Sequence, residues 1–316
     1  MRYAVPMPDL DVQTAADRVR RVREAVAQVV RGKAEVIELC LVAVVAGGHV
    51  LLEDVPGVGK TTLAHELAGA IGGSVRRVQF TSDLQPGDIT GVTVLDGKGG
   101  FQFRPGPLFA NVVLADEINR ATPKTQSALL EAMGERHVTV DGVSHPLPRP
   151  FLVVGTQNPH EDHGTFALPE SQLDRFLLRL HLGYPDRASE RAILRGSGDG
   201  AQVGAVIAPG EVEALGRAAL AVTVHPDIED ALLDLVERTR TDPRLVRGAS
   251  TRAAEALYRA VRALALARGR AYAIPEDLVE LVVPVLAHRV IARADGPGGD
   301  GAAAVLRALL REGPSL

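Results

Sequence analysis

The sequence predicts an α/β fold, with a nucleotide-binding domain built on a parallel sheet and a smaller second domain made of helices alone. First, an apolar strand at residues 49–52 leads through a Gly-Lys-Thr loop into a segment with helical apolar spacing at 63–71. Second, two continuous apolar runs, 111–115 and 151–156, end in polar residues, as strands buried on both faces of a parallel sheet do. Third, beyond residue 183 only helical spacing continues.

Composition is that of a soluble globular protein. With 316 residues, 46% of them hydrophobic, the chain is long enough for two domains. The net charge of −4 is mild and does not suggest a dedicated nucleic-acid binder. The single cysteine, Cys40, lies in an apolar run, so we expect a buried thiol and a reducing compartment. The N-terminus lacks an apolar core of signal-peptide length, and no apolar stretch reaches the length of a membrane span, so we expect a cytoplasmic protein without membrane insertion.

The chain before the first strand has the spacing of two helices. Apolar residues recur at helical intervals from about residue 11 to 46, and Gly32 marks the break between the helices.

The loop at residues 53–62 has the composition of a phosphate-binding loop. Gly57 and Gly59 let the backbone turn so that its N–H groups and the N-terminus of the next helix face an anion. Lys60 would place its charge on the β- and γ-phosphates of ATP, and the Thr61 hydroxyl would be a ligand of Mg²⁺. Asp54 stands where the usual pattern begins with glycine, and we expect this change to be tolerated. The residues expected to bind the nucleotide are Pro56, Gly57, Val58, Gly59, Lys60, Thr61 and Thr62.

Two hairpins interrupt the alternation of strands and helices. A strand at 74–80 and a polar, turn-rich stretch at 81–91 precede the first, at 92–103. A helix at 122–136, opened by a Thr-Pro pair, precedes the second, at 137–145, which has an Asp-Gly turn. Such hairpins line a pore or contact a partner in some proteins and only stabilise the surface in others, and the residues leave both readings open.

Polar side chains follow the two continuous apolar runs. Asp116 and Glu117 end the first run, and Asn158 follows the second. Ligands of open α/β sheets bind at the carboxyl ends of the strands, so these residues are expected beside the phosphate loop. Asp116 would hold Mg²⁺ through water, and Glu117 would accept a proton from the water that attacks the γ-phosphate. Asn158 would orient that water and sense the γ-phosphate.

Residues 160–163 read His-Glu-Asp-His, which raises the question of a zinc site. No further cysteine or histidine cluster completes a tetrahedral ligand set, so a polar loop is the preferred interpretation.

A short helix at 168–176 and a strand at 177–180 complete the first part of the chain. Gly-Tyr-Pro at 183–185 marks a boundary, which divides the chain into a nucleotide-binding domain, 1–183, and a helical domain, 184–316. Helices of the second domain are expected at 187–196, 210–220, 226–240, 250–268, 275–293 and 302–311, with no strand between them.

Taken in order, these motifs resemble the MoxR family of AAA+ ATPases. The resemblance rests on the phosphate loop, Leu-Ala-Asp-Glu-Ile-Asn-Arg-Ala at 114–121, Gly-Thr-Gln-Asn-Pro at 155–159, the stretch 168–176 and Arg-Gly-Ala-Ser-Thr-Arg at 247–252. It extends from about residue 20 to 293. It implies an α/β AAA+ subdomain with a helical lid, assembled as a ring that is usually a hexamer.

The resemblance also implies roles for single residues. Asp116 and Glu117 match the Walker B pair, and Asn158 matches sensor 1. Arg175 matches the arginine finger, which completes the site of the neighbouring subunit and stabilises charge in the transition state. Arg252 matches the sensor 2 arginine of the lid.

The function implied by the resemblance is Mg²⁺-dependent ATP hydrolysis that remodels protein clients, as a chaperone-like step in the maturation of protein complexes. Family members typically act with a partner that carries a von Willebrand factor A domain, which we expect on a separate polypeptide. Two alternatives are a magnesium-chelatase-like motor subunit, which has the same kind of partner, and a nucleic-acid-processing motor. The acidic balance counts against the second, and the hairpin at 92–103 offers only Lys98, with Arg104 just beyond it, to a phosphate backbone.

Overall fold

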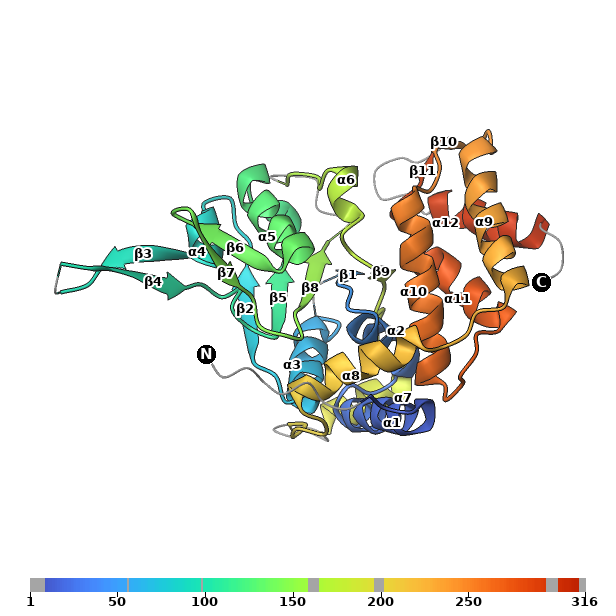
Figure 1. The fold of residues 1–316 in the computed structure, drawn as a ribbon, viewed down its shortest axis with the longest axis horizontal. Coiled ribbons are helices and arrows are strands. Elements are labelled where there is room, and N and C mark those ends of the chain that lie inside the picture. Colours follow the sequence, from blue (N-terminus) through green and yellow to red (C-terminus); the bar gives the residue numbers. More distant parts are fainter. Residues whose placement is uncertain are drawn as a thin grey trace.

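Five parallel strands form the central sheet of the computed structural model, which describes residues 9–55, 57–97, 99–158, 165–195, 202–293 and 301–312. The strands are β1 (Val50–Glu53), β2 (Val75–Gln79), β5 (Val112–Asp116), β8 (Leu152–Gln157) and β9 (Leu178–Leu180). Their order is β2-β5-β8-β1-β9, so β1, which leads into the phosphate loop, lies inside the sheet (Figure 1). The parallel sheet expected from the sequence is confirmed.

Helices cover both faces of this sheet. Those of the first half of the chain are α1 (Val12–Val29), α2 (Ala34–Val45), α3 (Lys60–Ala70), α5 (Pro123–Glu135) and the short α6 (Glu170–Leu173). The Asp11 side chain accepts a hydrogen bond from the Thr14 N–H and so caps α1. The expected break between α1 and α2 is confirmed at Gly32, which has a positive φ of 70°.

Successive residues of the central strands face two different hydrophobic cores. Leu114 and Val154 belong to a core shared with α1, α2 and α3, whereas Val113 and Val153 pack in a second core with α5. Side chains alternate between the faces of a strand, so a strand covered on both faces is apolar at every position. This explains why β5 and β8 read as continuous apolar runs.

Two antiparallel hairpins extend from the nucleotide-binding part. They consist of β3 (Gly91–Leu95) with β4 (Phe101–Pro105), and β6 (His137–Val140) with β7 (Val143–Pro146). The first reaches far beyond the rest of the molecule, as Figure 1 shows. At its base, Phe103 stacks on His145 of the second hairpin, with ring centroids 3.8 Å apart. The polar, turn-rich stretch at 81–91 contains a short helix, α4 (Pro86–Thr90), whose first turn is fixed by a hydrogen bond from Gln85 N–H to Asp88.

The second half of the chain is a helical domain, as expected. Its helices are α7 (Arg187–Leu194), α8 (Pro209–Leu220), α9 (Pro226–Thr241), α10 (Thr251–Ala267), α11 (Pro275–Leu286) and α12 (Gly301–Glu312). The expectation that no strand interrupts them is wrong at one place, where β10 (Leu245–Arg247) pairs with β11 (Ile291–Ala292). The helix predicted to reach residue 293 ends at Leu286. The apolar pattern that predicted a longer helix continues through buried Val290 and Ala292, but the backbone there forms turns and the strand β11. No helix among the described residues is long and apolar enough to cross a membrane.

The helical domain packs directly on the helices that precede the phosphate loop. Helix α10 contacts α2, and α8 contacts both α1 and α2. The backbone of Val203 donates to the Glu66 carboxylate of α3 at 2.7 Å, and Arg268 of α10 pairs with Glu38 of α2 at 2.8 Å. The division of the chain at residue 183 is still a prediction, since elements on both sides of it share one core.

Candidate functional site

A cavity of about 370 Å³ lies at the edge of the sheet where β1, β5 and β8 end. Parallel strands bring their carboxyl ends to one edge, so loops that are far apart in the sequence meet there. Seven residues predicted to form the site line this cavity, together with Arg77 and Gln79. The seven are Gly57, Gly59, Lys60, Thr61, Asp116, Glu117 and Asn158.

The phosphate loop has the backbone that an anion-binding loop requires. Gly57 and Gly59 have φ values of 88° and 97°, and Gly59 is the N-cap of α3. A Cβ at either glycine would meet no atom within 4 Å, so it is the left-handed backbone that favours glycine here. Val58 is only 5% exposed and anchors the loop in the core, whereas Pro56 lies outside the described residues. The start of α3 thus offers backbone N–H groups to a phosphate.

Asp54 connects the phosphate loop to residues 182–183, at the predicted boundary between the two domains. Its carboxylate accepts hydrogen bonds from the backbone N–H groups of Leu182 and Gly183, the second at 3.1 Å. Its carbonyl oxygen accepts a hydrogen bond from Lys60 Nζ at 2.8 Å. A glycine at this position, as in the usual pattern, would have no side chain for the first two bonds, which gives the departure a structural reason.

Thr156 fixes the two predicted catalytic carboxylates to each other. Its hydroxyl donates to Asp116 Oδ1 at 2.6 Å and accepts from the backbone N–H of Glu117 at 2.9 Å. The Thr156 residue is completely buried in β8, so both bonds are shielded from water. Glu117 itself has a left-handed backbone with φ of 56°, which turns its side chain out of the strand direction.

The sequence reasoning missed three residues that hold these carboxylates. Arg77 Nη2 lies 2.7 Å from Asp116 Oδ2. Gln79 Nε2 donates to Glu117 Oε2 at 2.7 Å, and Arg120 Nε lies 3.1 Å from the same oxygen. The strand that carries Arg77 and Gln79 was expected, but its pairing with β5 is a feature of the sheet order that the sequence does not reveal.

The two predicted arginines of the site, Arg175 and Arg252, do not line the cavity. Both are exposed: Arg175 follows α6, and Arg252 lies in the first turn of α10, which Ser250 caps. Thr62 is also exposed and lines a neighbouring cavity of about 400 Å³ that shares Thr61 with the first.

The residues of the cavity fit a magnesium nucleotide. The loop supplies N–H groups and an ammonium group for phosphates, and Thr61 and Asp116 supply the hard oxygen atoms that Mg²⁺ prefers. Among the described residues there is no group of three or more His, Cys, Asp and Glu side chains that could hold a metal ion by themselves. The histidines at 160–163 lie outside the described residues.

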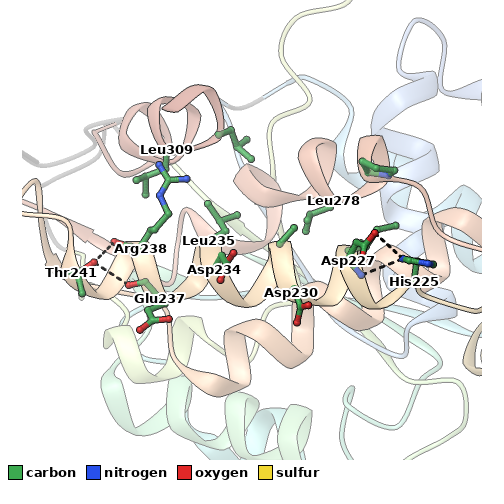
Figure 2. A pocket seen from close by; sticks show the side chains of 14 residues that line it. His225, Asp227, Asp230, Asp234, Leu235, Glu237, Arg238, Thr241, Leu278 and Leu309 are labelled. Carbon is green, nitrogen blue, oxygen red and sulfur yellow. Dashed lines mark hydrogen bonds and ion pairs between the residues drawn. The ribbon is translucent and has the colours of Figure 1, made fainter. Parts of the chain in front are cut away.

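A larger cavity, of about 930 Å³, lies in the helical domain and shares no residue with the phosphate loop. Figure 2 shows it along α9, where Asp230 and Asp234 project from the helix and Asp227 contacts His225. Leu278 of α11 and Leu309 of α12 contribute to its apolar wall. Carboxylates repel phosphate groups, so this cavity does not suit a nucleotide.

The sequence and the structure are similar to those of known proteins. The model of the ATPase family associated with various cellular activities (AAA) matches residues 49–178, and that of the AAA lid domain matches 237–308. Uncharacterized protein YeaC of Bacillus subtilis is 46% identical over 272 residues, 85% of each chain. Chaperone MoxR1 of Mycobacterium tuberculosis is 42% identical over 281 residues, 85% of this chain and 74% of that one. The crystal structure of a Cytophaga hutchinsonii protein assigned to the ATPases has a TM-score of 0.88 and 36% identity, over 96% of each chain.

Proposed function

The chain belongs to the MoxR family of AAA+ ATPases and hydrolyses ATP, and from this premise we propose that it is a chaperone-like remodelling factor for protein complexes in the cytoplasm. We propose further that it uses Mg²⁺, assembles as a hexameric ring and acts with a protein that carries a von Willebrand factor A domain. The proposal rests on one observation: the phosphate loop, Asp116 and Glu117 line the same cavity. The relative named Chaperone MoxR1 supports the chaperone-like role.

The loop and the Asp116 side chain would hold the magnesium nucleotide. The N–H groups of the loop and Lys60 would bind the phosphates, for which Lys60 must leave the carbonyl oxygen of Asp54. Thr61 and Asp116 would hold Mg²⁺, and Arg77 must then give up its contact with Asp116 Oδ2. When bound, the ion supplies positive charge that offsets the charge of the phosphates.

Glu117 and Asn158 would act on the attacking water. Glu117 would accept its proton, and Asn158, from the neighbouring strand end, would orient it. In the structure Gln79 and Arg120 hold the Glu117 carboxylate, so its release from these two side chains would accompany catalysis.

The position of Arg175 supports an action on a different subunit. It is exposed and outside the cavity formed by its own phosphate loop. An arginine finger supplied by a neighbour adds charge stabilisation only when two subunits meet, which makes hydrolysis depend on assembly. Arg252 is likewise exposed and outside the cavity. We propose that it reaches the nucleotide only after the lid rearranges.

The tip of the β3–β4 hairpin favours a protein client over a nucleic acid. Leu95 and Phe101 face each other across the hairpin and are 68% and 77% exposed. Exposed apolar side chains on a protruding element suit contact with protein, whereas binding to a phosphate backbone depends on clustered cations.

Two substitutions test the catalytic assignments. Lys60→Ala should abolish nucleotide binding, measured with a fluorescent ATP analogue. Glu117→Gln should retain bound ATP without hydrolysing it and should stabilise the ring. Lys124→Ala and Glu131→Gln, both at exposed positions of α5, are the matched controls and should leave both properties unchanged. Normal turnover by Glu117→Gln would exclude Glu117 as the general base.

A mixing experiment tests the arginine finger. Arg175→Ala and Lys60→Ala should each be inactive alone, because the first lacks the finger and the second lacks a working nucleotide site. Mixed rings contain interfaces that combine an intact site with an intact finger, so the mixture should recover part of the activity. No recovery in verified mixed rings would count against action in trans.

The partner and client can be identified with the Glu117→Gln trap. The trap is purified with ATP from its native cells, and the proteins that co-elute are identified, with Lys60→Ala as the control. A von Willebrand factor A protein and a client complex would support the chaperone-like role. Nuclease-sensitive nucleic acid with DNA-processing proteins would support the motor alternative instead.

A further inference from the structure

Two residues that follow α11, His288 and Arg289, bind the backbone on both sides of Arg175. Arg289 Nε donates to the Asp174 carboxylate at 2.7 Å, and its Nη2 donates to the carbonyl oxygens of Asp174 and Phe176 at 3.0 and 2.8 Å. Its Nη1 donates to the Leu177 carbonyl oxygen at 3.0 Å. The lid therefore holds the residues immediately before and after Arg175.

His288 adds a second contact from the lid to the same segment. Its Nε2 lies 2.9 Å from the carbonyl oxygen of Phe176. A carbonyl oxygen only accepts, so Nε2 carries the proton and donates. Burial and the charge of Arg289 lower the pKa of His288 well below its usual value, so the ring is neutral when it makes this bond.

Arg289 is a buried cation whose bonds are almost all directed to this segment. It is 6% exposed, and its charge is balanced by Asp174 and by carbonyl oxygens. Burying a guanidinium costs free energy unless its N–H groups are hydrogen-bonded. A movement of the lid that broke these bonds would therefore be strongly unfavourable. Residues 174–177 and residues 288–289, which follow α11, are therefore expected to move together.

The contacts from Arg289 and His288 reach the backbone around Arg175 and the Asp174 carboxylate, but not the Arg175 side chain. This side chain is exposed and lies on α5 at Gly134, where a Cβ would come 1.8 Å from its Nη1. Within the described residues its guanidinium makes no hydrogen bond or ion pair. The lid thus fixes the base of this side chain while its charged end stays available to another molecule.

We infer that Arg289 is a positioning residue for Arg175, and that the lid of each subunit sets where that subunit presents its arginine to the nucleotide of its neighbour. If nucleotide binding moved the lid of one subunit, it would in this way alter ATP hydrolysis in the neighbouring subunit. The inference rests on the proposed ring and on the trans action of Arg175.

Mixed rings test this inference with Arg289→Met. This substitution removes the donors but leaves the phosphate loop of the same subunit intact. Arg289→Met alone should lower kcat about tenfold or more, as partial loss of an arginine finger would, with unchanged affinity for a fluorescent ATP analogue. Mixed with Lys60→Ala subunits, which present a correctly held Arg175, it should recover activity as Arg175→Ala does.

Arg270→Met is the matched control. Arg270 pairs with the fully buried Asp277 in the same lid, and within the described part of the chain it makes no hydrogen bond or ion pair with residues 174–177. It should lower the thermal unfolding temperature without changing kcat per assembled ring. A general loss of lid stability would instead lower kcat in both variants.

The outcomes separate the inference from the proposed function. Recovery with Arg175→Ala but not with Arg289→Met, in rings purified through two different affinity tags so that they contain both subunits, would overturn the role of Arg289. Failure of Arg175→Ala to recover would overturn the trans finger itself. If Arg289→Met does not assemble, Asp174→Asn is judged by the same criterion, because it keeps the backbone bonds and removes only the ion pair.

Discussion

Arg77 Nη2 lies 2.7 Å from Asp116 Oδ2, the carboxylate oxygen that Thr156 does not bind. The contact neutralises a side chain that is only 13% exposed. A magnesium ion bound at Oδ2 would compete with this guanidinium, and each would weaken the binding of the other.

We therefore expect Arg77→Gln to lower the Mg²⁺ concentration required for half-maximal ATPase activity, by about threefold to tenfold if the pair contributes about 1 kcal/mol. A Mg²⁺ titration at constant ATP measures the effect. Arg76→Gln, the exposed neighbour on the same strand, is the control. An unchanged or higher Mg²⁺ requirement in Arg77→Gln would contradict competition at Asp116.

Gln79 should restrain Glu117. Its amide holds the Glu117 carboxylate at 2.7 Å, in a position where it is also 3.1 Å from Arg120. Gln79→Ala removes one of these two bonds, so we expect a higher basal ATPase rate, by a few-fold, with unchanged nucleotide affinity. Gln79→Glu should also raise the rate, because two carboxylates repel each other. If both variants hydrolysed ATP at the parent rate, Gln79 would have no part in holding the base.

Asp54 should contribute more to the stability of the junction between the two domains than to the affinity for nucleotide. Asp54→Gly removes the acceptor of the Leu182 and Gly183 N–H groups. Because hydrogen bonds to a charged group contribute about 1.5–3 kcal/mol, the free energy of unfolding should fall by about that amount. Denaturant unfolding measures the loss, and a fluorescent ATP analogue should bind with nearly the parent affinity. A loss of binding with unchanged stability would reverse this assignment.

The sequence predicted the elements that local chemistry determines. The glycines of the phosphate loop, the apolar runs of β5 and β8, and the polar residues at their ends all follow from local sequence, and the structure brings them into one cavity. The central strands β5 and β8 could be predicted because they are buried on both faces, so each reads as a continuous apolar run.

The features that the sequence did not predict depend on pairing between distant elements. Arg77 meets Asp116 only because β2 lies beside β5, and Arg289 reaches Asp174 across 115 positions of the chain. The short strand β11 was read as helix because burial of alternate residues over so few positions resembles a helical pattern. Such contacts come from the sheet order and the packing of the lid, which local periodicity does not contain.

His49 should make stability fall as the pH is lowered. Its Nδ1 accepts a hydrogen bond from the Val153 N–H at 2.9 Å, so Nε2 carries the proton and donates to Met133. Burial, with smaller effects from Arg136 and Arg259, lowers the pKa of His49 from 6.5 to about 4. The unfolded chain therefore binds more protons, and the stability contributed by neutral His49 is complete above pH 6.5 and is lost as the pH falls towards 4.

The variant His49→Gln isolates this effect, since glutamine does not titrate. The decrease in free energy of unfolding between pH 7 and pH 5 should be about 2 kcal/mol smaller in the variant than in the parent. His65→Gln, at an exposed position of α3, should keep the parent's pH dependence. Equal slopes for His49→Gln and the parent would show that His49 does not control the acid sensitivity.

Gly134→Ala should separate the position of Arg175 from the stability of the protein. Alanine in a helix is about 1 kcal/mol more favourable than glycine, so the thermal unfolding temperature should stay equal or rise. The new Cβ would lie 1.8 Å from Arg175 Nη1, so the guanidinium must leave its place on α5. We expect ATPase activity to fall several-fold with unchanged nucleotide affinity, and to recover on mixing with Lys60→Ala.

Glu131→Ala, on an exposed position of the same helix, is the control. Parent-like activity in Gly134→Ala would mean that the resting place of Arg175 on α5 has no influence on its catalytic position, and Arg289 would then act on the backbone alone.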